Sequence, residues 1–188
     1  MCPTGPMQRI AIIGCGGAGK STLARELGQL LEIEVFHLDA LHWQPGWVES
    51  EREEWADRQR QLVRRDRWII DGNYGATLDI RLAAADTVIF LDMPRRVCLR
   101  RVIWRTLRHY GRTRPDMGEG CPERLPDPTF LKWIWNYRRT RRPRILQQLH
   151  RLASTNGEKT IIRLRSRADV KRFLHRLQRA QHVAAEER

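Results

Sequence analysis

Residues 14–21 read Gly14-Cys15-Gly16-Gly17-Ala18-Gly19-Lys20-Ser21 and satisfy the pattern G-x-x-x-x-G-K-[ST] at every fixed position. The apolar run Ile10-Ala11-Ile12-Ile13 comes directly before it, and a segment with helical spacing follows from Ser21. A strand, a glycine-rich turn and a helix in this order place backbone N–H groups around a phosphate at the helix N-terminus. The sequence therefore predicts a phosphate-binding loop (P-loop).

The P-loop predicts ATP and Mg²⁺ as ligands. Lys20 is expected to reach the β- and γ-phosphates, and the Ser21 hydroxyl is expected to bind Mg²⁺. The residues predicted to bind the nucleotide are Gly14, Gly16, Gly17, Ala18, Gly19, Lys20, Ser21 and Thr22.

Short apolar runs alternate with longer polar segments along the rest of the chain, which is the pattern of an α/β fold. The apolar runs predict strands at 9–13, 34–38, 68–71, 87–91 and 160–164. Helical spacing predicts helices at 21–31, 51–65, 77–84, 95–110, 129–152 and 166–179. Strands that are apolar on both faces belong to a parallel sheet covered on both sides. We therefore expect a three-layer P-loop NTPase fold, with a five-stranded parallel sheet flanked by helices.

Residues 111–128 interrupt this alternation. They contain three glycines and four prolines, and they show neither a helical nor a strand period. Irregular segments longer than about 12–15 residues in a compact domain are usually lids or binding loops. We expect a lid insertion here, within a single domain that spans residues 1–188.

The charge of the chain is unevenly distributed. The formal net charge is +13, but residues 1–94 carry a net charge of −4 and residues 95–188 a net charge of +17. A basic half suits a polyanion, either nucleotide phosphates or nucleic acid, although an arginine-rich composition without function gives the same count. No apolar run approaches the roughly 18–20 residues of a membrane span, and residues 1–8 lack the basic start of a signal peptide. We expect a cytoplasmic protein without a membrane partner.

Two aspartates end predicted strands. Asp39 follows Phe36-His37-Leu38, and Asp71 follows Trp68-Ile69-Ile70. The carboxyl ends of parallel strands form the ligand-binding edge of such a sheet, so both carboxylates are expected near the magnesium. One could hold metal-bound water, and the other could accept a substrate proton. Asp92, which follows the fourth predicted strand, fits a metal site and a plain turn equally well.

Four further segments of the sequence carry a resemblance to a known protein family. They read Leu38-Asp39-Ala40-Leu41-His42-Trp43, Asp71-Gly72-Asn73-Tyr74-Gly75, Phe90-Leu91-Asp92-Met93-Pro94-Arg95 and Arg114-Pro115-Asp116-Met117-Gly118-Glu119-Gly120-Cys121-Pro122-Glu123-Arg124. Together they resemble the bacterial proteins labelled topology modulation proteins, over roughly residues 9–177. Those proteins are similar in turn to adenylate kinase and other small P-loop kinases.

The resemblance implies an ATP-dependent kinase with an acceptor-binding arm at about residues 40–66 and an arginine-bearing lid. Its acceptor would be a nucleoside monophosphate or a hydroxylated metabolite. Asp71 matches the position where adenylate kinases hold magnesium-bound water, so Ser21 and Asp71 form the implied metal site. Asp39 matches the acid that related kinases place near the acceptor hydroxyl. Adenylate kinases continue after Asp-Gly with Phe-Pro-Arg, whereas this chain continues with Asn73-Tyr74-Gly75, which favours a metabolite alcohol as acceptor.

Further residues are expected to contact phosphates or acceptor. Arginines of a closing lid stabilise the charge that phosphoryl transfer spreads over the moving group, and Arg101, Arg105 and Arg138 flank the predicted lid. Trp43 and Trp47 are expected in the acceptor site, either against a ring or as a packed wall. Arg81, after the Asp-Gly loop, is expected to hold an anionic acceptor.

Two other function classes stay open. A nucleic-acid-associated ATPase or DNA topology-modulating protein would use the basic half and bind DNA with a steep salt dependence, although the sequence has no helix-turn-helix or zinc-finger pattern. A nucleotide-dependent switch would be stabilised by Mg-ATP, yet no acceptor would accelerate hydrolysis.

Overall fold

The computed structural model describes residues 7–155 and 159–186. Five parallel strands form the central sheet in the order β2-β5-β1-β6-β7. Their bounds are β1 Arg9–Gly14, β2 Val35–His37, β5 Trp68–Asp71, β6 Thr87–Leu91 and β7 Thr160–Leu164. The predicted five-stranded parallel sheet is confirmed, and β5, β6 and β7 have the predicted bounds.

The central strands consist mostly of apolar residues, which are buried on both faces of the sheet. Ile10, Ile12 and Ile13 of β1 are fully buried, and all residues of β5 and β6 are buried. In the register of the sheet, Ile12 lies opposite Asp71 on one side of β1 and opposite Ile89 on the other. The P-loop after β1 and the carboxylate at the end of β5 therefore meet at one edge of the sheet.

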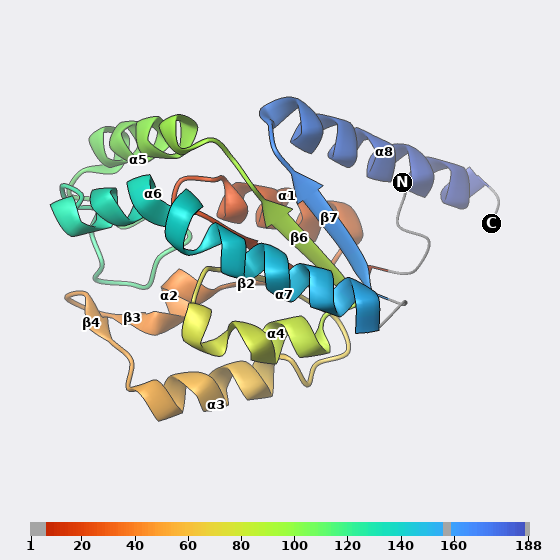
Figure 1. The fold of residues 1–188 in the computed structure, drawn as a ribbon, viewed down its shortest axis with the longest axis horizontal. Coiled ribbons are helices and arrows are strands. Elements are labelled where there is room, and N and C mark those ends of the chain that lie inside the picture. Colours follow the sequence, from red (N-terminus) through yellow and green to blue (C-terminus); the bar gives the residue numbers. More distant parts are fainter. Residues whose placement is uncertain (1–6, 156–158, 187–188) are drawn as a thin grey trace.

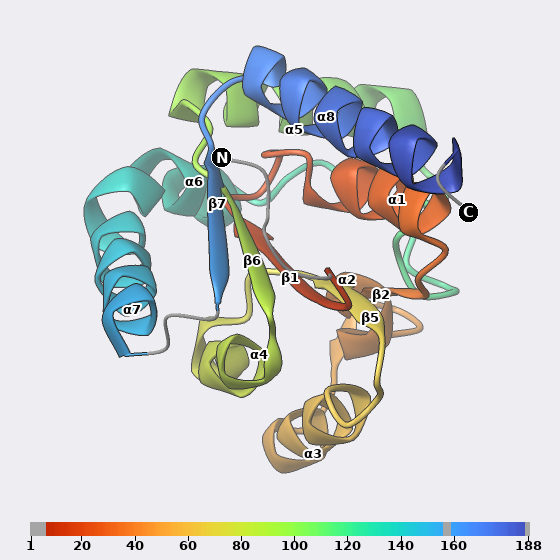
Figure 2. The ribbon, with the colours of Figure 1, turned by 90° about the vertical axis from the view of Figure 1, so that its right-hand side faces the viewer.

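Helices cover both faces of the sheet (Figures 1 and 2). α1 (Lys20–Leu31) and α8 (Arg167–Glu186) lie on one face, and α4 (Leu78–Ala84) and α7 (Arg142–Thr155) lie on the other. The other helices of the described chain are α2 (Leu38–His42), α3 (Arg52–Leu62), α5 (Arg95–His109), α6 (Pro128–Thr140) and the 3₁₀ turn η1 (Gly75–Thr77). Apolar residues of the strands and of both helix layers form one buried core. The three-layer P-loop NTPase fold is confirmed.

The arm (residues 40–66) contains a β-hairpin that the strand periodicity did not predict. β3 (Trp43–Gln44) pairs antiparallel with β4 (Val48–Glu49). The turn between them contains Pro45 and Gly46, and Gly46 has a φ of +80°, which a glycine adopts at little cost. The hairpin projects from the sheet beside the lid segment, residues 111–128, and Gly46 N donates to the carbonyl oxygen of Gly120 at 2.9 Å.

The single helix predicted at 129–152 is wrong. The structure has two helices instead, α6 and α7, which are separated at Arg141 (Figure 1). Pro143 explains the break, because it has no N–H to donate and its ring would clash with the carbonyl of Arg139 in a continuous helix. At the other end of α6, Asp127 caps the helix by accepting from Thr129 N at 2.7 Å.

No helix among residues 7–155 and 159–186 combines the length and the apolar character needed to cross a membrane.

Candidate active site

The P-loop joins β1 to α1, and its backbone requires glycine. Gly17 and Gly19 have φ angles of +75° and +99°, in a region that residues with a Cβ rarely adopt. A Cβ on Gly17 would also overlap the carbonyl oxygen of Cys98 in α5, so the loop packs directly on that helix. The Lys20 ammonium folds back over the loop and donates to the carbonyl oxygen of Cys15 at 3.2 Å.

A buried carboxylate lies beneath the P-loop serine. The Ser21 hydroxyl donates to Asp71 Oδ2 at 3.0 Å, and the other oxygen of Asp71 is bound to His37 Nδ1 at the end of β2. Burial lowers the pKa of His37, but the hydrogen bond and charge of Asp71 outweigh it and raise that pKa above its ordinary value. Sequence reasoning did not assign His37 to the site. Its position follows from the register, in which His37 lies directly opposite Asp71.

Asp39 lies in the first turn of α2, directly after β2. Its Oδ1 accepts a hydrogen bond from the Tyr74 hydroxyl at 2.9 Å. Burial raises the pKa of Tyr74, and the charge of Asp39 raises it further, so the phenol stays a neutral donor. Tyr74 therefore holds one oxygen of a carboxylate that was predicted to act on the acceptor.

The two tryptophans of the hairpin lie between the arm and the lid segment. The ring centroids of Trp43 and Trp47 are 5.4 Å apart. Trp47 Nε1 donates to the carbonyl oxygen of Pro122 at 3.0 Å, and the Cys121 thiol donates to the carbonyl oxygen of Gln44 at 3.1 Å. The lid segment is thus docked on the hairpin, with both rings at the boundary.

Glu123 holds the lid segment against α5. Its buried carboxylate accepts from Arg105 Nε at 3.2 Å, from the Thr106 hydroxyl at 3.1 Å and from Arg114 Nε at 2.6 Å. Burial lowers the pKa of Arg105, and the neighbouring guanidinium of Arg114 lowers it further. Sequence reasoning had no signal for Glu123, because it lies in a segment without periodicity.

These elements surround one cavity of about 1020 Å³. Arg101 reaches the P-loop from one wall, where its Nη1 donates to the carbonyl oxygen of Ala18 at 2.8 Å. The predicted site residues that line the cavity are Gly16, Gly17, Gly19, Lys20, Ser21, Thr22, Asp39, Trp43, Trp47, Arg101 and Arg105. Lining residues that sequence reasoning did not assign include Arg25, Asn73, Tyr74, Arg108 and Asp116. The structure thus brings residues predicted to bind the nucleotide and residues predicted to bind the acceptor to the wall of one cavity.

Five predicted residues do not line this cavity. Gly14 and Ala18 belong to the P-loop and Asp71 lies beneath Ser21, whereas Arg81 and Arg138 lie away from the site. Arg81 of α4 is fully buried and donates to the carbonyl oxygens of Gly72 and Tyr74, both at 3.1 Å. Burial lowers the pKa of Arg81 to about 10. This placement corrects the expectation that Arg81 holds an acceptor, because the guanidinium is enclosed below the loop after β5. Arg138 is exposed on α6, whose buried residues are Ile134 and Tyr137, so the expectation that it reaches the phosphates is not supported either.

Asp92, for which a metal role and a structural role were both open, is part of a structural ion-pair network. It accepts from Arg142 Nε at 2.8 Å and from Arg163 Nε at 2.9 Å, which joins the end of β6 to α7 and β7. Burial raises the pKa of Asp92, but the hydrogen bonds from both arginines outweigh it and hold that pKa below its ordinary value.

The residues at Ser21 and Asp71 fit Mg²⁺, since hydroxyl and carboxylate oxygens are the ligands that this ion prefers. No group of three or more His, Cys, Asp or Glu side chains within the described ranges could hold a metal ion by itself. Proteins usually bind Mg²⁺ through one or two side chains together with substrate phosphates. The site therefore suits an ion that arrives with a nucleotide.

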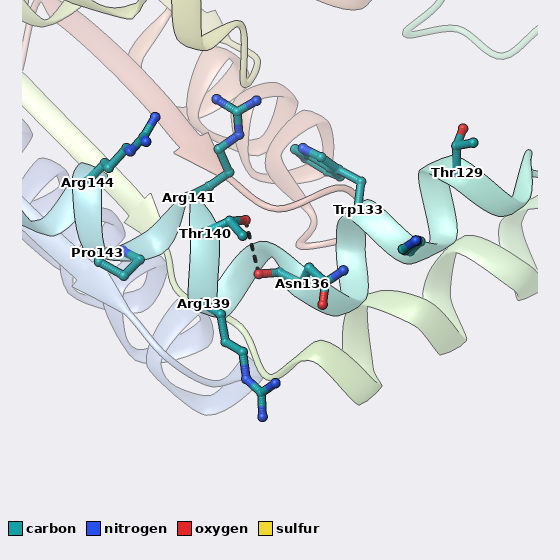
Figure 3. Close-up of a pocket in the computed structure, with 9 residues that line it drawn as sticks. Thr129, Trp133, Asn136, Arg139, Thr140, Arg141, Pro143 and Arg144 are labelled. Carbon is teal, nitrogen blue, oxygen red and sulfur yellow. Dashed lines mark hydrogen bonds between the residues drawn. The ribbon is translucent and has the colours of Figure 1, made fainter.

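A second pocket, of about 760 Å³, lies at the break between α6 and α7 (Figure 3). It is lined by Thr129, Lys132, Trp133, Asn136, Arg139, Thr140, Arg141, Pro143 and Arg144. Figure 3 shows Arg139 and Arg141 pointing to opposite sides of the helices. The lining contains four basic side chains and no acidic one, and Trp133 also lines the main cavity.

Comparison with protein-family models finds no match. One curated relative is the uncharacterized protein YqaC of Bacillus subtilis strain 168. It is 26% identical over 135 residues, which span 69% of this chain and 72% of that protein.

Solved structures with a similar fold include three shikimate kinases. The enzyme from Acinetobacter baumannii, in complex with shikimate, has a TM-score of 0.57 at 17% identity and covers 96% of this chain and 94% of its own. The enzyme from Bacteroides thetaiotaomicron has a TM-score of 0.54 at 19% identity, and the match covers 94% of this chain and 99% of that enzyme's chain. The enzyme from Aquifex aeolicus has a TM-score of 0.51 at 16% identity, and the match covers 94% of this chain and 98% of that enzyme's chain. These similarities show that the chain has the fold of small P-loop kinases.

Proposed function

We propose that this chain is an ATP-dependent kinase that transfers the γ-phosphate of Mg-ATP to a small acceptor. The observation that carries the proposal is the single cavity shared by Lys20 and Ser21 of the P-loop, Asp39 of α2 and Arg101 of α5. Phosphoryl transfer depends on positioning and on charge stabilisation, and this arrangement supplies groups for both. The likeness of the fold to small P-loop kinases supports the same class.

In this mechanism the P-loop and Lys20 hold the β- and γ-phosphates. Ser21 and Asp71 would hold Mg²⁺, which would neutralise part of the phosphate charge when bound. Tyr74 occupies Oδ1 of Asp39, which leaves Oδ2 to take the proton of the acceptor hydroxyl. The acceptor oxygen forms a bond to the γ-phosphorus while the bond from that phosphorus to the bridging oxygen breaks. ADP leaves with the electron pair of the broken bond. Arg101 and Arg105 stabilise the charge on the group in transit.

The acceptor in this proposal is a hydroxylated metabolite, in preference to a nucleoside monophosphate. Asp39 offers a carboxylate oxygen to a hydroxyl group, and Trp43 and Trp47 form an apolar wall against a small ring. We also propose that the chain is one domain in which the lid segment and the arm close on the two substrates. The relationship to topology modulation proteins and adenylate kinases is part of this proposal and rests on the strings quoted above.

The proposal is tested by measuring ADP production from Mg-ATP. The acceptor panel contains sugars, hydroxylated acids and nucleoside monophosphates, and Lys20→Ala serves as the blank. We expect one small acceptor to accelerate ADP production in the wild-type protein and none to do so in Lys20→Ala. Equal ADP production with and without every acceptor would refute the kinase assignment.

A second candidate function, binding of single-stranded nucleic acid, is favoured by one feature of the surface. Trp104 and Trp135 are exposed, and each has a guanidinium over its ring: Arg108 at 5.2 Å from the Trp104 centroid and Arg95 at 3.9 Å from that of Trp135. Aromatic rings beside arginines are the usual platform for stacked bases. Quenching of tryptophan fluorescence by an oligonucleotide, weakening steeply with salt and lost in Trp104→Ala, would support it. Absence of quenching at low salt would exclude it.

A further inference from the structure

The second pocket, at the break between α6 and α7, carries positive charge without a protein counterion. Four exposed basic side chains line it, and no acidic side chain does: Lys132, Arg139, Arg141 and Arg144. None of the four forms an ion pair or a side-chain hydrogen bond with another residue of the described ranges 7–155 and 159–186. The pocket is therefore a concave surface whose charge only a ligand or solvent ions can balance.

The helix break separates these cations from an arginine with a structural role. Arg142 Nε donates to Asp92 Oδ1 at 2.8 Å and so belongs to the ion-pair network at the end of β6. Arg141 and Arg144, on either side of it in the sequence, line the pocket together with Pro143. The same basic run thus contributes one arginine to the fold and leaves its neighbours at the pocket.

The pocket also contains neutral polar groups. The Thr140 hydroxyl donates to the backbone carbonyl oxygen of Asn136 at 3.1 Å, which is the dashed line in Figure 3. The side-chain amide of Asn136 forms no hydrogen bond with another described residue, so its two N–H donors are free for a ligand. The lining therefore offers both charged and neutral donors, the groups that bind phosphate oxygens.

The size and charge of the pocket indicate what it would hold. A volume of about 760 Å³ falls in the range of roughly 300–1,000 Å³ that small-molecule sites have. Arg139 and Arg141 point to opposite sides of the helices, so an anion that contacts both guanidinium groups must be extended (Figure 3). Two phosphate groups carry a charge of about −3 to −4 near pH 7, which matches four cations. Guanidinium groups bind phosphate through paired hydrogen bonds.

An aromatic wall separates this pocket from the P-loop. Trp133 lines both cavities, and its ring stacks on that of Phe130 with 5.8 Å between the centroids. A Cβ added to Gly16 would be 2.8 Å from the Phe130 ring and 3.5 Å from the Trp133 ring, so both rings pack against the P-loop. No residue of the P-loop lines the second pocket. A ligand there is therefore held by groups other than those that hold the nucleotide phosphates.

We propose that the pocket at the α6–α7 break is a second ligand site, which binds a small molecule with at least two phosphate groups. The four basic side chains contact the phosphates, and the Asn136 amide supplies a neutral donor. A small ligand is favoured over a nucleic-acid strand, because strands bind on exposed rings. The ring in this pocket, Trp133, is half-buried between Phe130 and Tyr137. The proposal depends neither on an acceptor nor on kinase activity.

Isothermal titration calorimetry with inorganic tripolyphosphate tests this site. The protein is first saturated with ADP, so that the P-loop is occupied, in Mg²⁺-free buffer at about 0.15 M salt, which screens non-specific attraction. We expect one tripolyphosphate to bind per chain. Titration of Lys20→Ala without ADP should give the same affinity, because the site does not use the P-loop.

Two substitutions and a matched control locate the binding. Arg141→Gln and Arg144→Gln should each weaken tripolyphosphate binding by about fivefold or more, because each removes a charged donor to phosphate. Arg138 is an exposed arginine of α6 that does not line the pocket. Arg138→Gln removes the same charge and should change the affinity by less than about twofold. All three side chains are exposed, and equal melting temperatures check that the variants fold alike.

Four results would overturn the proposal. They are the absence of tripolyphosphate binding to the ADP-saturated protein, an equal loss of affinity in Arg138→Gln, and binding of citrate, which carries three carboxylates, as tight as that of tripolyphosphate. The fourth is binding of a single-stranded oligonucleotide but not of tripolyphosphate, with loss in Arg141→Gln, which would assign the surface to nucleic acid. A failure to find an acceptor would count against the kinase assignment alone, since no acceptor enters these titrations.

Discussion

Replacing Glu123 by glutamine should destabilise the protein more than any other single change in the lid segment. The carboxylate is 6% exposed and accepts three hydrogen bonds, two of them from arginines. A hydrogen bond to a charged group contributes about 1.5–3 kcal/mol, and removing one partner of a buried ion pair costs about 3–5 kcal/mol. Arg105 is about one-third exposed and the glutamine keeps one acceptor oxygen, so we expect a loss of about 3 kcal/mol.

This loss is measured by urea unfolding followed by tryptophan fluorescence, with Glu119→Gln as the exposed control. For a chain of this length about 3 kcal/mol corresponds to a fall in melting temperature of roughly 6–12 °C. Amide exchange should also become faster at Gly111, whose N–H donates to the carbonyl oxygen of Glu123 at 3.0 Å. A difference below about 0.5 kcal/mol between Glu123→Gln and Glu119→Gln, the usual range of surface substitutions, would refute the structural role of Glu123.

Three further substitutions test the P-loop, the Asp92 network and the floor of the site. Gly17→Ala should lower ADP affinity at least tenfold, because the new Cβ is strained at positive φ and overlaps Cys98, and unchanged calorimetric affinity would contradict this. Asp92→Asn should cost about 2 kcal/mol at pH 7. Because the folded pKa of Asp92 is depressed, this difference is fully present above about pH 4 and should shrink as the pH falls through the folded value, so a constant difference from pH 7 to pH 3 would be inconsistent with it. Arg81→Leu should lower the free energy of unfolding by about 2–3 kcal/mol, because two buried carbonyls lose their donor. A fully stable Arg81→Leu protein with a raised KM for the acceptor would restore the acceptor role.

The sheet and the P-loop were predictable because local patterns determine them. Runs such as Ile10-Ala11-Ile12-Ile13 are buried on both faces, as the strands of a parallel sheet covered by helices are. The convergence of Asp71 with Ser21 also followed from the sequence, since carboxyl ends of parallel strands share an edge. The hairpin at Pro45-Gly46 had a turn signal, but its strands are too short to show a period.

The positions of Arg81, Asp116 and Glu123 have different physical origins. Arg81 lies three residues after Leu78 and one before Leu82, both buried, so the helical period already placed it on the core face of α4. Asp116 and Glu123 had no such signal. Their roles depend on how an irregular segment folds against α5 and the arm, which no local pattern encodes.

The most direct test follows the γ-phosphate itself. Mg-ATP labelled at the γ-phosphate is incubated with the wild-type protein, with Lys20→Ala and with Asp39→Asn in the presence of the acceptor that accelerates ADP production. We predict that the label appears on the acceptor in one-to-one proportion to ADP in the wild type and is lost in Lys20→Ala. In Asp39→Asn, where the proton acceptor is missing, transfer should slow by about 10²–10⁴-fold. Label found only in inorganic phosphate, in the same amount with and without acceptor, would contradict the central claim that this cavity transfers phosphate to a second substrate.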